Sequence, residues 1–535
     1  MRNKSFLKGA LILTITGVVA KIFGAVYRIP LTNLLGAEGM GVYQLVFPLY
    51  SLLLMLSSAG VPAGLSKMIA EDNVSGGKRT KTIFLSAMRM LLISGAVAAL
   101  FIFFFADKIA ELQGNADASL PYKLLAPSLI FVAVTSVFRG YFQGYQSMIQ
   151  SGMSQVFEQI VKLAAGLYLA YKFMPMGVAY GAAGAILGIT ISEFASMVTL
   201  TINYFTFKEG REERKLKARA DMKTTMDILK ISFPVTLCAM VLPITQLIDS
   251  VVVVNLLSAA KGVTEATKAY GLLTGPVNSL INLPTVLTMS ISLSVLPSLS
   301  TSFAENNRAE AEHKTRISVK MTLMIALPSV AGLMLLAKPI TDLLYGGLAA
   351  EELTEIYRLL SVSALGVVFI SLIQTFSAVM QAVGKPYFPV ISMAVSGVFK
   401  VILNVIMIKA GAGIFGVAVG TVICYGICML MNLIFLSKYV ILYSDIYSTA
   451  VAPLLASVVM GAGIFAFNGL LTRFISPAVA LFIVIAVSVV LYVAALILLG
   501  GLKAKDFSSV PLPKFMKKIL CSENANENNY SGDRV

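Results

Sequence analysis

Long apolar runs follow one another along almost the whole chain, and short polar connectors separate them. The hydrocarbon core of a bilayer is roughly 30 Å thick, so a helix needs about 20 apolar residues to cross it. Runs of this length predict an all-α integral membrane protein with about 14 transmembrane helices. The predicted helices cover residues 6–30, 41–66, 82–106, 121–145, 153–173, 178–205, 228–257, 271–302, 317–337, 357–383, 387–409, 413–437, 447–470 and 477–501.

The composition agrees with a bilayer environment, because 57% of the residues are hydrophobic, 13% are charged and the mean hydropathy is +0.83. The net charge of +15 does not indicate a nucleic-acid partner, because the cations lie in alternate connectors and form no basic, aromatic-studded patch. Basic connectors mark the cytoplasmic side of a membrane protein. Those around Lys78, Lys217 and Arg308 follow even-numbered helices. We therefore expect a multi-pass plasma-membrane protein with both termini in the cytoplasm.

Several short motifs occur twice in the same order, which indicates an internal repeat. Ser154 and Lys162, for example, match Ser392 and Lys400 at one constant offset. Six helices per repeat give two lobes of the same orientation, and the interface between such lobes is the natural place for a transport pathway. The predicted organisation is an N-lobe (1–207), a cytoplasmic linker (208–227), a C-lobe (228–440), an extra helix pair (445–501) and a disordered cytoplasmic tail (502–535).

Ionisable side chains inside a membrane helix are costly, so each one needs a partner or a water-filled cavity and is a candidate for function. In the first helix, Lys21 and Arg28 are seven residues apart and share one face. Either both line a pathway, or Arg28 extends to the outer interface and Lys21 alone lies inside the membrane. In the fifth helix, Glu158 and Lys162 are four residues apart and are expected to pair.

Lys400 has no acidic neighbour in its own helix, so it requires an anion from another helix or a hydrated cavity. Asp249 in the seventh helix and Glu193 in the sixth are the acidic counterparts, and each could hold a coupling cation or neutralise a lysine. Arg139 and Lys320 lie within about two turns of the cytoplasmic interface, and we expect both to extend toward it.

The sequence offers little for other chemistry. The cysteines, Cys238, Cys424, Cys428 and Cys521, form no CxxC pair, so we expect small packing residues and neither a disulfide framework nor a metal site. No G-x-x-x-x-G-K-[ST] motif is present, so transport energy is expected from the membrane potential or from a sodium or proton gradient. No cofactor is expected.

Several segments resemble one known group of transporters. Leu35-Gly36-Ala37-Glu38-Gly39, Ala59-Gly60-Val61-Pro62 and Leu296-Pro297-Ser298-Leu299-Ser300 are similar to the stage V sporulation protein B group of the multidrug/oligosaccharidyl-lipid/polysaccharide exporter superfamily. The resemblance extends over nearly the whole chain and implies the exporter-superfamily fold.

The same superfamily contains the lipid II flippase, whose first helix carries two essential cations on one face. The resemblance therefore implies that Lys21 and Arg28 hold the pyrophosphate of a lipid-linked substrate. Where that flippase has an arginine shortly before the Leu-Pro of its eighth helix, this chain has Ser279. Some members of that branch bind sodium in the second lobe. The nearest matches to their sodium ligands are Asp249, Asn404 and Thr421, while Ile408 stands in place of a second carboxylate.

The main hypothesis is an alternating-access flippase that moves an undecaprenyl-linked sugar intermediate, a peptidoglycan precursor or a related polysaccharide unit, from the inner to the outer leaflet. Its substrate-binding candidates are Lys21, Arg28, Lys162 and Lys400. The expected partners are this substrate and membrane lipids, and the chain is expected to be monomeric and not an enzyme.

Two other functions remain open at this point. A cation-coupled multidrug antiporter has the same architecture but would need acidic and aromatic groups around its cavity. A membrane-embedded glycosyltransferase or polymerase would need carboxylates on loops. Glu351, Glu352 and Glu355 are the candidates for that role, and an exposed helix start accounts for them more simply.

Overall fold

The computed structural model describes residues 2–58, 60–75, 78–208, 210, 217–441 and 445–502. Within these ranges the chain is helical and contains no β-strand, which confirms the predicted all-α fold. The expected tail beyond residue 502 and residues 211–216 of the linker lie outside the described residues. Of the linker, residues 217–221 are not helical, and the next helix begins at Met222.

Among the described residues, 11 helices are long and apolar enough to cross a membrane, or 12 if the bent pair Ala350–Ser363 and Gly366–Ala382 forms one span. The chain is therefore a multi-pass membrane protein, although the predicted number of 14 is not confirmed. The 60-residue run Ile15–Val74 counts once, although the chain bends within it. Met148–Phe173, which contains Glu158 and Lys162, is not among the 11.

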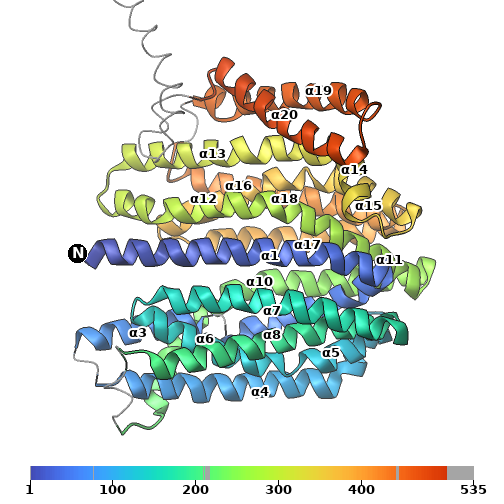
Figure 1. Cartoon of the computed structure of the whole chain (residues 1–535). Helices are drawn as coiled ribbons and strands as arrows, with labels where there is room; N and C mark the ends of the chain where they lie inside the picture. Colours follow the sequence, from blue (N-terminus) through green and yellow to red (C-terminus); the bar gives the residue numbers. More distant parts are fainter. Residues whose placement is uncertain are drawn as a thin grey trace, which may run out of the picture.

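The first part of the chain forms the N-terminal bundle, which occupies the lower half of Figure 1. Its elements are α1 (Arg2–Leu45), α2 (Phe47–Ser58), α3 (Val61–Val74), α4 (Thr80–Leu112), η1 (Ala116–Ala118), α5 (Ser119–Leu125), α6 (Ser128–Gly144), α7 (Met148–Phe173), η2 (Met174–Met176) and α8 (Val178–Thr206).

The second part forms the C-terminal bundle, which occupies most of the upper half of the same view. Its elements are α10 (Met222–Lys261), α11 (Val263–Leu272), η3 (Leu273–Val277), α12 (Asn278–Ala304), α13 (Arg308–Leu335), α14 (Ala337–Leu344), α15 (Ala350–Ser363), α16 (Gly366–Ala382), α17 (Tyr387–Lys409) and α18 (Gly413–Ser437). Asp221 caps α10 by accepting a hydrogen bond from the Thr224 backbone N–H, 3.0 Å away. This bond lowers the pKa of the Asp221 carboxyl.

An outer helix pair completes the molecule at the top of Figure 1. It contains η5 (Tyr447–Val451), α19 (Ala452–Leu471) and α20 (Pro477–Leu498). The pair packs on α13 and α14 through a buried apolar cluster that includes Leu336, Met460 and Leu481. The Tyr492 hydroxyl donates to the Met324 carbonyl oxygen at 2.9 Å and fixes α20 against α13.

The course of α1 changes at Gly36, whose φ of 69° lies in the left-handed region that glycine adopts without strain. Pro30, six residues earlier, lies inside the helix without ending it. α1 runs from the N-terminal end of the molecule to the opposite end, and α3 lies back at the N-terminal end (Figure 1). The bend therefore reverses the chain and returns it through the molecule.

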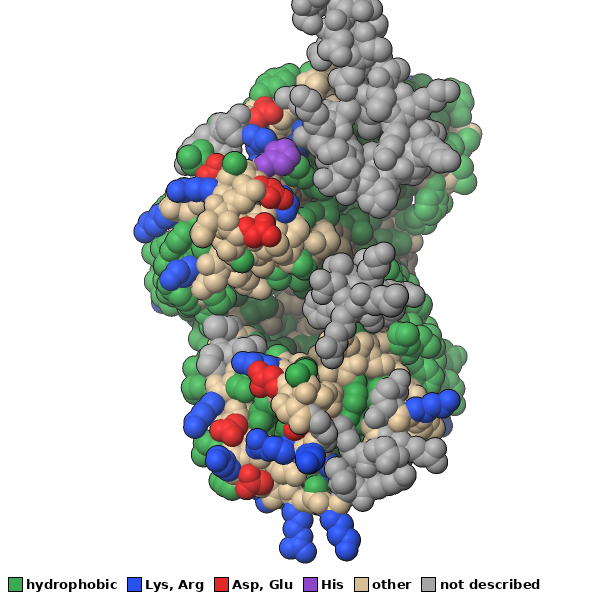
Figure 2. All heavy atoms as spheres, turned by 90° about the vertical axis from the view of Figure 1, so that its left-hand side faces the viewer, with side chains coloured by type: hydrophobic (Ala, Val, Ile, Leu, Met, Phe, Trp, Pro, Cys, Tyr) green, Lys and Arg blue, Asp and Glu red, His purple; other side chains and the backbone are tan. Residues whose placement is uncertain are grey.

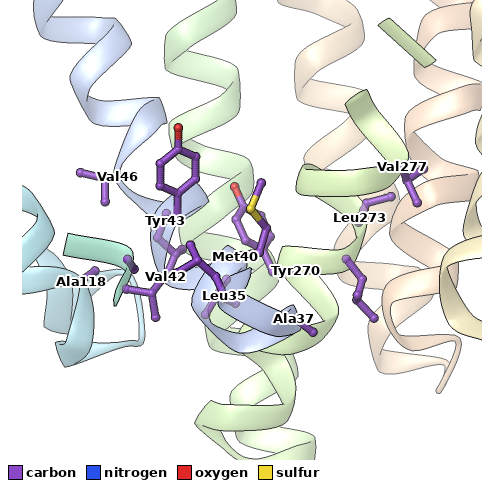
Figure 3. Packing of buried hydrophobic residues seen from close by; sticks show 14 of the residues in the cluster. Leu35, Ala37, Met40, Val42, Tyr43, Val46, Ala118, Tyr270, Leu273 and Val277 are labelled. Atoms are coloured by element: carbon purple, nitrogen blue, oxygen red, sulfur yellow. The ribbon is translucent and has the colours of Figure 1, made fainter. Parts of the chain in front are cut away.

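The two bundles meet tightly at the end of the molecule opposite the N-terminus. Figure 3 shows Met40 and Tyr43 of the last part of α1 beside Tyr270 of α11. A Cβ atom at Gly41 would collide with the Thr267 carbonyl oxygen, and one at Gly271 would collide with α1 backbone atoms. Backbone therefore lies directly against backbone, and this end is sealed. We call this contact of α1 with α11 the glycine seal.

The opposite end of the molecule is polar. Figure 2 shows charged side chains of both signs on this face, with hydrophobic side chains along its flanks. Exposed Lys78 and Arg79 precede α4, and exposed Arg308 begins α13. A charged end between apolar flanks is the distribution expected where helices leave a bilayer.

Candidate functional site

A cavity of about 340 Å³ lies between the two bundles. α1 and α7 provide one wall, and α12 and α16 provide the other. Helices that are far apart in the sequence therefore enclose one space at the predicted interface between the repeats. The lining residues are Lys21, Gly24, Ala25, Arg28, Lys162, Ser279, Asn282, Thr285, Val286, Met289 and Gln374.

Both cations of α1 line this cavity. The Lys21 ammonium lies 2.8 Å from the Met289 sulfur, and the Arg28 guanidinium lies 3.5 Å from the Ser279 hydroxyl. Gly24 and Ala25, which lie between the two cations, are small enough to leave room beside them. Of the two alternatives for Arg28, the structure agrees with the first, because its side chain lines the cavity together with Lys21.

Lys162 adds a third cation from α7. Its ammonium lies 5.4 Å from the centroid of the Tyr27 ring, at the distance of a cation–π contact. It is also close enough to Arg28 for the two charges to repel one another. None of the described residues that line the cavity is acidic. Three cations in a site partly shielded from water create a strong positive potential, which suits an anionic ligand.

An ionic cluster lies beside Lys162 in the N-terminal bundle, and it corrects two expectations. Glu158 pairs with Arg139 of α6 at 2.8 Å and not with Lys162. Arg139 was expected to extend to the interface, but its side chain is only 19% exposed and also donates to the Ser196 hydroxyl. Glu193 of α8 is close enough to be repelled by Glu158 and attracted by Arg139 and Lys162. Two carboxylates therefore share two cations, one of which also lines the cavity.

Lys320 differs from expectation in the same way as Arg139. We expected its side chain to extend toward the interface, but it is buried in α13 with 4% of its surface exposed. The reason is that α13 begins at Arg308 and not near residue 317, so Lys320 lies well inside the helix.

A second ionic group lies in the C-terminal bundle. Lys400 of α17 pairs with Asp249 of α10 at 2.8 Å, and the two side chains are 18% and 15% exposed. The Asn404 amide donates to the other Asp249 oxygen. Lys400 therefore pairs with an anion from another helix, which is one of the two alternatives predicted for it. It does not line the cavity, so the structure does not support its predicted role in substrate binding. The Thr421 hydroxyl donates to the Val417 carbonyl of its own helix at 2.8 Å.

The remaining candidates have simple structural roles. Glu351 and Glu352 lie in the first turn of α15, where Glu352 accepts a hydrogen bond from the Ala349 backbone at 3.2 Å. Cys424 and Cys428 are buried thiols. The side chain of Cys238 and all of Cys521 lie outside the described residues. In the described part of the chain, no group of three or more His, Cys, Asp or Glu side chains could hold a metal ion.

Sequence reasoning missed most of the wall formed by α12 and α16. Asn282, Thr285, Met289 and Gln374 carry no charge, and the sequence has no motif that separates them from ordinary helix-packing residues. An asparagine or glutamine in an otherwise apolar membrane helix is the one available signal. That signal would have identified Asn282 and Gln374.

Comparisons with known proteins agree with this architecture. The family described as "Polysaccharide biosynthesis protein" matches residues 6–303, and the MatE family matches residues 234–406. Stage V sporulation protein B of Bacillus subtilis (strain 168) is 32% identical over 366 residues, which cover 66% of this chain and 70% of that protein. Lipid II flippase MurJ of the same organism is 26% identical over 498 residues, which cover 89% and 90% of the two chains.

Solved structures show the same fold at lower identity. Lipid II flippase MurJ in an inward closed conformation matches with a TM-score of 0.70 at 19% identity, over 91% of this chain and 98% of that one. An inward-facing multidrug resistance transporter of the MATE family matches with a TM-score of 0.68 at 17% identity, over 81% and 97%. The chain therefore belongs to the polysaccharide biosynthesis protein family and has the fold of the MOP superfamily of transporters.

Proposed function

We propose that this protein is a flippase for a lipid-linked sugar intermediate that carries phosphate, such as an undecaprenyl-linked precursor of peptidoglycan or of a related polysaccharide. The observation that supports the proposal most is the cavity between the bundles, which Lys21, Arg28 and Lys162 line without an acidic residue. Phosphate groups need such cations when they leave water. The lipid tail would remain in the bilayer while the headgroup passes between the bundles. The similarity to stage V sporulation protein B and to lipid II flippase MurJ supports the same function.

The multidrug antiporter is the second candidate, because the MatE family matches part of the chain and MATE transporters share the fold. An organic cation, however, would be repelled by a cavity that contains three cations. The charge of the cavity therefore favours an anionic headgroup.

We further propose that the chain acts as a monomer with both termini in the cytoplasm. In that orientation, the glycine seal faces the outside and the charged face of Figure 2 faces the cytoplasm. Transport then requires the seal to open while the bundles close at the other end, as in alternating access.

Coupling to a proton is proposed to involve Glu193. Lys162 lines the cavity and also interacts with Glu158 and Glu193, so a bound phosphate would compete with these carboxylates for one cation. Asp249, Asn404 and Thr421 are the candidate ligands of a sodium ion. The charge of Asp249, however, is already neutralised by Lys400. An ion couples to transport only if its affinity differs between the two conformations. A phosphate bound at Lys162 would change the electrostatic surroundings of Glu193, and with them its affinity for a proton.

The decisive experiment measures movement of a labelled lipid-linked precursor across vesicles that contain the purified protein. The unmodified protein should transport it, and Lys21→Ala and Lys162→Ala should transport it at least about tenfold more slowly. Lys338→Ala is the matched control, because Lys338 pairs with Asp342 on an exposed surface away from the cavity. Transport that survives both cavity substitutions, or transport of organic cations in place of the precursor, would refute the proposal.

A further inference from the structure

The two walls of the cavity differ completely in charge. The three lining cations all belong to α1 and α7. The opposite wall comes from α12 and α16, and neither of these two helices contains an Asp, Glu, Lys, Arg or His residue along its whole length. This wall still offers hydrogen-bonding groups, from Ser279, Asn282, Thr285 and Gln374.

One hydrogen bond from behind this wall reaches Gln374. The Thr288 hydroxyl lies 3.3 Å from the side-chain oxygen of Gln374, and 3.0 Å from both the Ser371 hydroxyl and the Thr285 carbonyl oxygen. Thr288 and Ser371 are both fully buried. Because the oxygen of the Gln374 amide is held from the buried side, its NH₂ group is the part left for the cavity. Asn282, by contrast, is exposed and presents a complete amide.

We infer that the wall of α12 and α16 binds the sugar next to the phosphate, while α1 and α7 bind the phosphate itself. This inference rests on the proposed function and adds the orientation of the headgroup to it. Side-chain amides supply donors and acceptors that match sugar hydroxyl and acetamido groups, whereas they are weak partners for a phosphate compared with Lys and Arg. Because a neutral sugar needs no oppositely charged partner, a wall without charged side chains is suited to bind it.

The size of the cavity limits what fits beside the phosphate. Its 340 Å³ is at the lower end of the roughly 300–1,000 Å³ that ligand pockets enclose. The proximal part of the headgroup fits such a space, but a long glycan does not. We therefore assign sugar recognition to the first residue of the glycan and not to its distal end.

Binding of two probes to the purified full-length chain in lipid nanodiscs tests this assignment. One probe is a short-chain polyprenyl pyrophosphate, and the other is the same lipid with one N-acetylhexosamine attached. Gln374→Leu and Asn282→Leu should each weaken binding of the sugar-bearing probe by about five- to tenfold, the value of a lost hydrogen bond. Binding of the sugar-free probe should stay unchanged. Lys21→Ala should weaken binding of both probes.

Two further variants separate a positioning role from general damage. Thr288→Val should reduce the preference for the sugar-bearing probe, whereas Thr288→Ser, which keeps the hydroxyl, should retain it. Leu287→Ala on the exposed side of α12 is the control and should change neither affinity. Equal weakening of both probes by the Gln374 and Asn282 substitutions would overturn the inference and leave the flippase proposal standing. Failure of the unmodified protein to bind either probe would instead overturn the proposed function.

Discussion

Lys400 and Asp249 form an ion pair that joins α17 to α10 across 2.8 Å. Asn404 adds a hydrogen bond to the same carboxylate. The negative charge of Asp249 is therefore balanced by a cation that belongs to the chain. We interpret this pair as a structural element of the C-terminal bundle.

Asp249→Asn and Lys400→Met should each destabilise the protein, because each leaves one charge without its partner in a mostly buried site. The loss is expected to be on the order of 3 kcal/mol. The double variant should recover most of this loss, since both charges are then removed. Thermal unfolding of the two single variants and the double variant in detergent measures the effect. Additive destabilisation in the double variant would contradict a pair.

The second prediction concerns the cations of α1. Lys21→Ala and Arg28→Ala should each lower the transport rate by about 10- to 100-fold, the value of a lost charge-assisted contact. Neither should lower the unfolding temperature, because each removes a charge that lies near other cations. Vesicle transport and thermal unfolding of the same preparations give both readings. Normal transport by Arg28→Ala would show that this side chain does not hold the headgroup, although it lies in the cavity.

The third prediction separates the two coupling candidates. Glu193→Gln should bind substrate at least as tightly as the unmodified protein, because one carboxylate no longer competes for Lys162, but its transport rate should no longer respond to a proton gradient, because the titrating carboxylate is gone. A folded Asp249→Asn protein should keep that response. Transport is measured in vesicles with an imposed proton gradient and, separately, an imposed sodium gradient. Loss of the ion response in Asp249→Asn alone would assign coupling to the C-terminal bundle.

The fourth prediction concerns orientation. In a background whose four native cysteines are replaced by alanine, Lys78→Cys should react with an impermeant maleimide only after the cytoplasmic side is opened. Glu351→Cys should react from the outside of intact cells. Both positions are exposed in the structure, so burial does not complicate the comparison. The reverse pattern would invert the topology.

The fifth prediction concerns the glycine seal. Gly41→Ala should prevent closure at this end, because the added Cβ would collide with the Thr267 carbonyl oxygen. A cysteine at Ala266, which is 1% exposed in the sealed state, should then become reactive toward a water-soluble maleimide, and transport should fall. Gly17→Ala is the matched control on the same helix, since a Cβ there meets no atom within 4 Å. Unchanged reactivity at position 266 would mean that the seal tolerates the methyl group.

The apolar runs predicted the membrane fold correctly, because a bilayer imposes one requirement on every spanning helix. Because a charge inside a membrane is energetically costly, Lys21, Arg28 and Lys162 were also predicted as site residues. The structure brings these three residues into one cavity. The pairing of Glu158 was wrong for a physical reason. Spacing along one helix shows which charges can meet, but it cannot show that Arg139 of a neighbouring helix lies closer.

The uncharged wall could not be predicted, because serine and threonine in membrane helices often bond to their own backbone. Thr285 and Ser279 both do so here, at 2.9 Å and 2.6 Å, while also lining the cavity. A sequence does not show which of these hydroxyl groups faces water. The break between the predicted helices 6–30 and 41–66 does contain the bend of α1, but the helix continues past Pro30 and changes course at Gly36.

The direct backbone contact at Gly41 and Gly271 also bears on the electrical insulation of the membrane. A transporter that binds a large headgroup must at some stage admit water from one side, and a gap at the far end would turn that passage into a leak. Where glycine lets a carbonyl group and a helix backbone touch, no space remains for a hydrated ion. A contact of this kind keeps ions from crossing at this end, and it depends on the absence of a side chain at Gly41 and at Gly271.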